Sequence, residues 1–373
     1  MYVGVPKEIK NHEYRVGLIP AAVRELTVAG HQVFVENDAG AAIGYSNEDY
    51  EAVGATIVQQ ASDVFERAEM IVKVKEPQAE ERALLRPHHV LFTYLHLAPD
   101  APQLKGLMDS GATCIAYETV TDVHGRLPLL APMSEVAGRM AVQAGAHCLE
   151  KSMGGSGMLL GGVPGVAPAK VTIVGGGVVG QNALAIAVGM GAQVTVLDRS
   201  MDVLRRLDQV YSNRITTLFS TREALESSVV HSDLVIGAVL IPGAAAPKLI
   251  TREMIKTMAA GSVVVDVAID QGGCMETSKP TTHSEPTYVV DGVVHYCVAN
   301  MPGGVARTAT QALNNATLPF VLQLANKGAQ QALLDNTHLR NGLNVYRGEV
   351  TYAEVAEARG MPFREALDAL QKG

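Results

Sequence analysis

The segment of residues 171–198 constrains the fold more than any other part of the chain. It opens with a short β-branched run, Val171–Val174, which is typical of a buried parallel strand. A small-residue segment with a helical period, Val178–Met190, follows, and a second strand, Val194–Leu197, leads to Asp198. The turn between the first strand and the helix contains three glycines spaced G-x-G-x-x-G, namely Gly175, Gly177 and Gly180. This order of elements predicts a βαβ unit.

Each part of this unit suits the binding of a dinucleotide. Gly175 permits the tight turn, Gly177 lets a pyrophosphate approach the backbone, and Gly180 lets the helix pack closely on the strand. The unpaired N–H groups at the helix start attract phosphate. Asp198 follows Gly175 by 23 residues, so its carboxylate can accept hydrogen bonds from ribose hydroxyls and would repel a 2′-phosphate. The pattern predicts NAD rather than NADP, and the alternative is a glycine-rich turn in some other α/β unit.

Length, composition and charge narrow the class of protein. A chain of 373 residues is too long for one ordinary core, so two domains are expected. Hydrophobic residues make up 47% and charged residues 18%, as in a well-buried α/β protein. The net charge is −8 and no block of Lys or Arg occurs, so neither nucleic acid nor an anionic membrane is an expected partner.

The cysteines and the apolar segments indicate the cellular compartment in which the protein is expected. The four cysteines are scattered and form no C-x-x-C pair, which predicts reduced buried thiols in a cytoplasmic protein rather than a zinc site or a disulfide framework. The N-terminal sequence MYVGVPKEIK carries charge where a signal peptide needs apolar residues. The most apolar region, Met153–Gly180, is interrupted by prolines and Lys170, which excludes it as a membrane span.

Strand and helix signals alternate through the first third of the chain. The expected strands are Val3–Val5, Gln32–Val35, Met70–Val74, His89–Leu95 and Thr113–Ala116, and the expected helices are Pro20–Ala29, Gln78–Leu85 and Ala101–Ser110. Repeated βα units predict a parallel, doubly wound sheet.

The rest of the chain continues the same pattern around the glycine-rich unit. One long helix, Pro132–Lys151, leaves the first domain, and Gly154–Pro168 has the composition of a loop or linker. The later expected elements are strands Arg214–Leu218, Leu234–Ala238 and Ser262–Val267, helix Thr251–Ala259, a hairpin of Tyr288–Val290 with Val293–Tyr296, and helix Gly304–Asn326. The remaining stretch to Gly373 is polar and helix-like.

These elements predict an α/β protein with two doubly wound, Rossmann-like domains whose sheets are mostly parallel. The nucleotide-binding domain, residues 129–305, is expected to be inserted into a discontinuous substrate domain made of residues 1–128 and 306–373. The two chain termini would then share one domain.

Three polar residues of the first domain lie just beyond expected strands. Arg15 lies between the first strand and the first helix, Lys75 follows Met70–Val74, and His96 follows His89–Leu95. Ligands of open α/β sheets bind beyond the carboxyl ends of the strands. A guanidinium, an ammonium and an imidazole at one edge could bind a small carboxylate and supply an acid–base group. The alternative for each is an ordinary solvated side chain.

Three acidic residues are further candidates for the site. Asp270 lies beyond the expected strand Ser262–Val267 and would face a cleft if the two domains close on each other. Asp266 lies inside that apolar strand, where hydrogen bonding to the loop is the simpler expectation. Glu118 is only a weak candidate for a metal ligand, and we predict no metal site.

Several long strings of this sequence resemble those of the L-alanine dehydrogenase family. They are VGVPKEIKNHEYRVGLIP, IVKVKEP, LFTYLHLA, APMSEVAGRMA, VTIVGGGVVG, VVDVAIDQGG, PTTH and VANMPGGVARTAT. The resemblance extends along the whole chain, and several of the strings are long and non-generic. It implies the NAD-dependent, reversible oxidative deamination of L-alanine to pyruvate and ammonium by a homohexamer.

The resemblance also implies roles for individual residues. Arg15 and Lys75 would hold the substrate, and His96 and Asp270 would be the proton donor/acceptor pair. The family's cofactor pattern falls on Ser134, Val178, Val179, Asp198, Ser220, Val239, Leu240, Val267, Ala268, Ile269, Asp270, Lys279, Val298, Ala299, Asn300 and Met301. One departure is Val203, which stands where the family often has a lysine or arginine, so that contact to the adenosine end is in doubt.

Three other functions share parts of this pattern. The NAD-binding component of a proton-pumping nicotinamide nucleotide transhydrogenase has the same two-domain design, but it needs no small-carboxylate site. Saccharopine dehydrogenases are more distant relatives. A non-catalytic NAD-binding protein would keep the glycines and Asp198 but would have no use for the four polar residues Arg15, Lys75, His96 and Asp270. Selectivity among amino acids depends on pocket volume, which the sequence leaves open.

Overall fold

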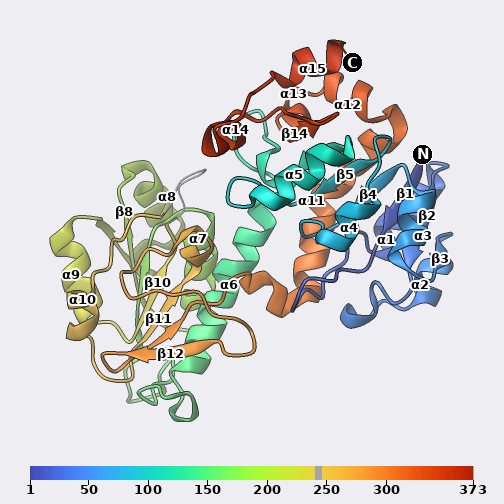
Figure 1. Cartoon of the computed structure of the whole chain (residues 1–373). Coiled ribbons are helices and arrows are strands. Elements are labelled where there is room, and N and C mark those ends of the chain that lie inside the picture. The colour runs from blue at the N-terminus through green and yellow to red at the C-terminus, as the bar shows by residue number, and fades with distance from the viewer. Residues whose placement is uncertain (240–245, 373) are drawn as a thin grey trace. The chain divides into compact units, whose positions relative to one another are not determined.

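The structure is a computed structural model that describes residues 1–239 and 246–372 (Figure 1). The chain divides into two compact units, one made of Met1–Met133 with Val305–Gly373 and the other of Ser134–Gly304. Each unit contains one mostly parallel sheet accompanied by helices. The prediction of two doubly wound, Rossmann-like sheets is therefore confirmed.

The sheet of the first unit has eight strands in the order β15-β14-β6-β5-β4-β1-β2-β3. Its strands are β1 (Tyr2–Val5), β2 (Gln32–Glu36), β3 (Thr56–Val58), β4 (Met70–Val72), β5 (Val90–Thr93), β6 (Thr113–Ala116), β14 (Leu343–Tyr346) and β15 (Glu349–Val350). Strands β1 to β6 pair in parallel, whereas β14 pairs antiparallel with β6 and β15 antiparallel with β14. The chain order reverses between β1 and β4, so the topological switch point lies there.

Helices of the first unit follow its strands in the usual βα alternation. They are α1 (Pro20–Val28), α2 (Asn47–Glu51), α3 (Ala61–Arg67), α4 (Ala79–Leu84), α5 (Ala101–Ser110), α11 (Ala306–Lys327), α12 (Ala329–Asp335), α13 (Thr337–Arg340), α14 (Ala353–Arg359) and α15 (Ala366–Lys372). Local chemistry sets their ends. Asp100 caps α5 by accepting the Gln103 N–H at 2.9 Å, and Gly111 ends it in the left-handed conformation.

The sheet of the second unit has seven strands in the order β12-β13-β11-β10-β7-β8-β9. They are β7 (Lys170–Val174), β8 (Gln193–Asp198), β9 (Ile215–Phe219), β10 (Leu234–Gly237), β11 (Val263–Asp266), β12 (Thr287–Val290) and β13 (Val293–Tyr296). Among the strands that the structure describes in this sheet, β12 and β13 pair antiparallel and the others pair in parallel, and the hairpin turns at Asp291-Gly292 as predicted. The chain order reverses between β7 and β10, which makes that boundary the switch point.

The helices of this part of the chain are α6 (Ala131–Cys148), α7 (Val178–Gly189), α8 (Met201–Tyr211), α9 (Arg222–Val230) and α10 (Arg252–Thr257). The strands they accompany are short apolar runs: β10 and β11 have every residue buried, as parallel strands covered on both faces require. Within the described ranges, no helix has both the length and the apolar character needed to cross a bilayer.

Departures from the predicted elements include the unpredicted strand β3, some strand ends and the last part of the chain. Strand β4 stops at Val72, two residues early, and the chain leaves β11 at Asp266 to form the 3₁₀-helix Val267–Gln271. The helix-like stretch before Gly373 contains the strands β14 and β15. Pairing with β6 buries Leu343 and Val345 completely, and this long-range contact outweighs the local helical preference.

Candidate active site

Arg15, Lys75 and His96 leave the same edge of the first unit's sheet. Arg15 follows β1, Lys75 follows β4, and His96 follows β5. Strands β1 and β4 are neighbours, as are β4 and β5, and both pairs run in parallel. The structure therefore brings the three residues to the carboxyl edge of adjacent strands, at the switch point where such sheets bind their ligands.

Arg15 is buried and pairs with a carboxylate close to it in the chain. Its Nε lies 2.7 Å from Glu13 Oε1 and its Nη2 lies 2.6 Å from Glu13 Oε2, a bidentate ion pair in which both side chains are shielded from solvent. Burial alone would raise the pKa of Glu13. The hydrogen bonds and the charge of Arg15 outweigh that effect, with a contribution from Lys75, and hold the pKa of Glu13 below its ordinary value. Arg15 Nη1 meets Met133 Sδ at 3.0 Å.

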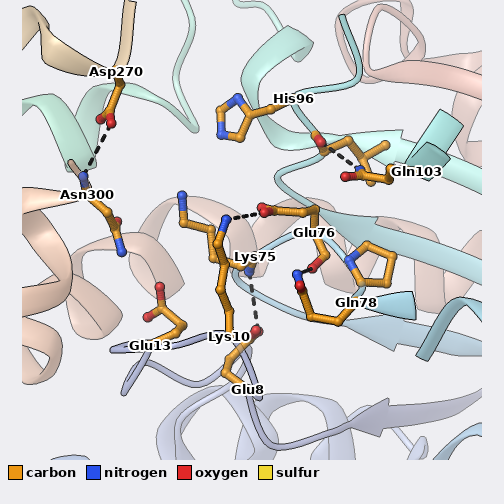
Figure 2. A network of polar contacts seen from close by, with 12 residues as sticks. Glu8, Lys10, Glu13, Lys75, Glu76, Gln78, His96, Gln103, Asp270 and Asn300 are labelled. Atoms are coloured by element: carbon orange, nitrogen blue, oxygen red, sulfur yellow. Dashed lines mark hydrogen bonds and ion pairs between the residues drawn. The ribbon is translucent and has the colours of Figure 1, made fainter. Parts of the chain in front are cut away.

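Lys75 is held through its backbone by a buried glutamate (Figure 2). Glu8 Oε1 accepts the N–H of Val74 at 2.7 Å and that of Lys75 at 3.3 Å. Thr93, at the end of β5, donates its hydroxyl to the Lys75 carbonyl at 3.0 Å. The backbone of Lys75 is thus fixed from two sides, so its side chain starts from a defined position.

The other oxygen of Glu8 belongs to a buried charge cluster. Lys73 Nζ lies 3.0 Å from Glu8 Oε2 and 2.6 Å from Glu81 Oε1, and its side chain is fully buried. Burial opposes charge on Lys73, but the two carboxylates prevail and raise its pKa. Burial also raises the pKa of Glu8, against the charge of Lys73. This cluster anchors the start of the loop that carries Lys75.

His96 is exposed, but its backbone is tightly held. It has a φ of +50°, in the left-handed region that side chains other than glycine seldom adopt. Glu118, in the 3₁₀-helix Tyr117–Thr119 after β6, accepts the His96 N–H at 2.6 Å. The same carboxylate accepts the Leu95 N–H at 3.1 Å. Backbone strain sustained by surrounding contacts is typical of functional sites.

In the second unit, the three glycines of the fingerprint have different reasons to be glycine. Gly175 has a φ of +102°, and a Cβ there would lie 2.7 Å from the Ala238 carbonyl oxygen. A Cβ on Gly180 would lie 1.8 Å from the Gly175 carbonyl oxygen. A Cβ on Gly177 would meet no protein atom within 4 Å, and its φ of −69° suits any residue. The fold requires Gly175 and Gly180, whereas Gly177 keeps the backbone accessible.

The neighbourhood of Gly177 fits a dinucleotide. Gly177 is the N-cap of α7, so the first N–H groups of that helix, including those of Val178 and Val179, have no partner within the helix. Asp198 ends β8 beside them, and its two oxygens accept the N–H groups of Gly176 and Ser200 at 2.7 Å each. A carboxylate oxygen can accept a second hydrogen bond, which leaves capacity for ribose hydroxyls.

The remaining predicted cofactor positions mostly follow the carboxyl ends of strands in this sheet. Ser220 follows β9, Val239 follows β10, Val267 to Asp270 follow β11, and Val298 to Met301 follow β13. Ser134 lies in the first turns of α6, and Lys279 is exposed, with its Nζ 4.5 Å from the centroid of the Tyr288 ring. Leu240 lies outside the described residues. Val203, the departure from the family, lies in α8, and a Cβ added to Gly176 would come within 2.6 Å of its Cγ1.

Asp270 lies in the 3₁₀-helix beyond β11 and is exposed. Its Oδ1 accepts the Asn300 N–H at 3.3 Å, and Asn300 has a φ of +60° (Figure 2). Asp266 is fully buried at the base of this turn. It accepts the N–H groups of Ala268 at 3.1 Å and Cys274 at 2.9 Å, as well as the Ser278 hydroxyl at 2.5 Å. Asp266 thus shapes the turn, and Asp270 presents its carboxylate beyond the strand.

Comparison with known proteins decides the family. The domain family "Alanine dehydrogenase/PNT, N-terminal domain" matches residues 4–137, and "Alanine dehydrogenase/PNT, C-terminal domain" matches residues 141–353. A protein of Halomonas elongata named alanine dehydrogenase is 65% identical over 370 residues, covering 99% of this chain and all of the relative. The chain belongs to the alanine dehydrogenase/PNT family. A nicotinamide dinucleotide cofactor is implied by this family together with the Rossmann-like fold.

Solved structures of the alanine dehydrogenase/PNT family have the same fold. One titled L-alanine dehydrogenase has a TM-score of 0.94 and 51% identity, over 96% of this chain and 99% of the other. A transhydrogenase from Sinorhizobium meliloti has a TM-score of 0.81 and 25% identity, over 94% of this chain and 99% of the other. On both measures the chain is more similar to the dehydrogenase than to the transhydrogenase.

The sequence did not predict the carboxylates that hold Arg15, Lys75 and His96 in place. Glu13 pairs with Arg15, Glu8 holds Lys75, and Glu118 holds His96, yet only Glu118 drew attention, as a possible metal ligand. In the described part of the chain, no group of three or more His, Cys, Asp or Glu side chains is arranged to hold a metal ion. One signal was present: Glu8 and Glu118 lie within three residues of the ends of strands with buried apolar residues.

Proposed function

We propose that the protein catalyses the NAD-dependent, reversible oxidative deamination of L-alanine to pyruvate and ammonium. The single observation that carries the proposal is the convergence of Arg15, Lys75 and His96 at one sheet edge in a chain of this family. An NAD-binding protein without catalysis would have no use for a strained histidine beside two cations.

The two cations suit a small 2-amino or 2-oxo acid. Glu13 orients the guanidinium of Arg15, and we assign that guanidinium to the substrate carboxylate. Lys75, with its backbone fixed by Glu8 and Thr93, supplies a second positive charge and hydrogen-bonds the carbonyl oxygen of pyruvate. A buried guanidinium held by a carboxylate keeps its orientation, which lowers the entropic cost of binding.

Proton transfer is assigned to His96 and Asp270. A nicotinamide bound at this site would supply the hydride acceptor for the alanine Cα. Asp270 orients and deprotonates the water that attacks the iminium carbon, and it then gives that proton to the amino nitrogen of the carbinolamine so that ammonia can leave. His96 then takes the proton of the carbinolamine oxygen at Nε2 as ammonia leaves, because its Nδ1 lies on the side of Glu118.

The nucleotide is assigned to the carboxyl edge of the second unit's sheet. The open backbone at Gly177 and the N–H groups at the start of α7 suit the pyrophosphate, and Asp198 suits the ribose hydroxyls. The Asp198 carboxylate would repel a 2′-phosphate, so we propose NAD rather than NADP. The other proposed cofactor contacts are those of the predicted positions, with Leu240 among them.

A spectrophotometric assay tests the proposal. Purified protein is mixed with NAD and L-alanine, and NADH absorbance is followed, with D-alanine, L-serine, L-lysine and NADP as comparisons. We expect turnover with L-alanine and NAD. A general acid–base residue contributes about 10²–10⁴ in rate, so His96→Ala should lower kcat by at least that order while NADH binding survives. Hydride exchange between nucleotides without any use of L-alanine would favour the transhydrogenase alternative instead.

The proposal also covers the cellular compartment and the oligomeric state of the protein. We also propose a cytoplasmic location, which the four buried free cysteines support. We further propose a homohexamer of the 39.4 kDa chain. Light scattering coupled to size-exclusion chromatography measures the mass directly, and a monomer or dimer would contradict the proposal.

A further inference from the structure

We propose that Glu118 is a positioning residue that keeps His96 in its reactive place. This inference rests on the proposed function, since it takes His96 as the proton-transferring group. It concerns a residue to which neither the glycine fingerprint nor the substrate-binding pattern gives a role. Glu118 contacts both the backbone and the neighbourhood of the ring of His96, and it is itself held in place by neighbouring residues.

The backbone of His96 adopts a conformation that it would not adopt alone. A φ of +50° is sparsely populated by residues with a side chain, so contacts around the residue must select it. The carboxylate of Glu118 makes these contacts. Its Oε1 accepts the His96 N–H at 2.6 Å, and the Leu95 N–H lies 3.1 Å from Oε1 and 3.2 Å from Oε2. Two successive N–H groups can converge on one anion only when the chain turns sharply between them.

The ring of His96 is placed by the same carboxylate and by Tyr94. Glu118 Oε1 lies 3.9 Å from Nδ1, which is too long for a hydrogen bond but close enough to orient the imidazole by charge. The rings of Tyr94 and His96 are stacked, with centroids 5.8 Å apart and planes within 7°. Tyr94 is itself fixed, because its hydroxyl donates to the Leu129 carbonyl at 2.5 Å.

The residues on either side of Glu118 are themselves held by packing and hydrogen bonding. It lies between Tyr117 and Thr119 in a short 3₁₀-helix, and only 15% of its side chain is exposed. The Tyr117 ring is fully buried and meets the Tyr94 ring edge-on at 5.1 Å. Thr119 accepts a hydrogen bond from the Asn344 side chain of β14 at 2.8 Å. The carboxylate is therefore held by β6 and β14 while it holds the loop after β5.

Three variants of Glu118 test this role, with Glu51→Gln on the exposed face of α2 as the matched control. Glu118→Ala removes both acceptors, and we expect kcat to fall at least tenfold while KM for L-alanine does not rise and the Kd of NADH stays within about threefold. Glu118→Gln keeps an acceptor oxygen at the same reach, and it should restore most of the lost kcat. If the alanine variant does not fold, Glu118→Asp decides, because its carboxylate is one methylene short of both N–H groups and kcat should again fall.

A pre-steady-state measurement separates positioning from general destabilisation. His96 acts after hydride transfer, so a misplaced imidazole should leave hydride transfer fast and slow the later step. Rapid mixing of Glu118→Ala with NAD and L-alanine should then show a burst of bound NADH that is larger than in the parent. Parent-like kcat in Glu118→Ala would overturn the proposal, as would a glutamine variant as impaired as the alanine variant.

The outcome for His96→Ala keeps the two proposals apart. If His96→Ala is inactive and Glu118→Ala is unaffected, the proposed function stands and the role of Glu118 fails. If His96→Ala turns over normally, the assignment of His96 fails first, whatever Glu118 does.

Discussion

At the scale of single residues, His89 has both ring nitrogens engaged in one tautomer. Its Nδ1 accepts the Arg86 N–H at 2.9 Å, and its Nε2 faces the Phe65 carbonyl oxygen at 2.8 Å. A proton on Nδ1 would oppose the Arg86 N–H, and burial lowers the pKa of His89 from its ordinary 6.5 to about 4. The unfolded chain therefore binds this proton at a higher pH than the folded chain does.

This difference makes stability depend on pH in a defined window. The stabilisation from neutral His89 is complete above pH 6.5 and is lost as the pH falls through the range to about 4, by up to about 3 kcal/mol. We expect the thermal midpoint of the parent to fall more steeply across this range than that of His89→Gln. An exposed histidine elsewhere in the chain supplies the control, because His231→Gln should keep the parent slope. Equal slopes in all three proteins would refute the assignment.

The buried pair of Glu13 and Arg15 predicts a second effect at this scale. Removing one partner of a buried ion pair leaves an uncompensated charge and costs about 3–5 kcal/mol. We expect Glu13→Gln to lose stability of this order and to raise KM for L-alanine, because Arg15 loses its bidentate clamp. Asp202→Asn, which breaks an exposed pair with Arg205, should change stability by less than about 1 kcal/mol. Denaturant unfolding of both variants makes the comparison.

Which of these residues could be found from sequence depends on how far their partners lie along the chain. Arg15, Lys75 and His96 were predicted because each follows a recognisable strand. The contact of Glu118 with His96 spans 22 residues and that of Glu8 with Lys75 spans 67, and both depend on which strands become neighbours. One sequence carries strand signals but not strand order, so these partners were not predictable.

At the scale of elements, the turn between β7 and α7 allows its glycines to be tested separately. Gly177→Ala meets no protein atom, so we expect its stability to change by less than about 0.5 kcal/mol while NADH affinity falls at least tenfold. Gly180→Ala forces a Cβ against the Gly175 carbonyl and should cost about 1–3 kcal/mol as well as binding.

The last residue of the same helix provides the matched control for both variants. Gly189 is exposed, and a Cβ there has no neighbour within 4 Å. Gly189→Ala should therefore bind NADH normally and be as stable as the parent, or more stable by up to about 1 kcal/mol. NADH fluorescence titration and thermal unfolding read both properties. Normal NADH affinity in Gly177→Ala would show that no pyrophosphate approaches this turn.

Elements were predictable where local pattern and packing agree. The strands and helix around Gly175 were predicted to within a residue or two because apolar run, glycines and helical period coincide. The strands β14 and β15 were missed, since Leu343–Tyr346 becomes a strand by pairing with β6 more than 200 residues earlier in the chain. The exits of β4 and β11 were placed too late, because the apolar composition continues into Val74 and Val267 after the ladder has ended.

At the scale of the whole molecule, the cofactor should stabilise the folded chain by mass action. A ligand present at 100 times its Kd adds about 2.7 kcal/mol to the free energy of unfolding. We expect NAD and NADH to raise the thermal midpoint of the parent and of His96→Ala alike, since His96 plays no part in the nucleotide site. NADP at the same concentration should raise it far less, because of Asp198. Equal shifts with NAD and NADP would contradict the predicted preference.

The candidate site depends on strand β14, which is synthesised late. Asn344 braces the turn that carries Glu118, yet it is made after all of residues 134–304. At roughly 5–20 residues per second, the ribosome spends about ten to thirty seconds on that insertion. We therefore expect the nascent chain to complete the nucleotide-binding sheet first and to secure the His96 loop only after β14 has emerged from the ribosome. Pulse labelling followed by limited proteolysis should show residues 134–304 protected earlier than the segments on either side.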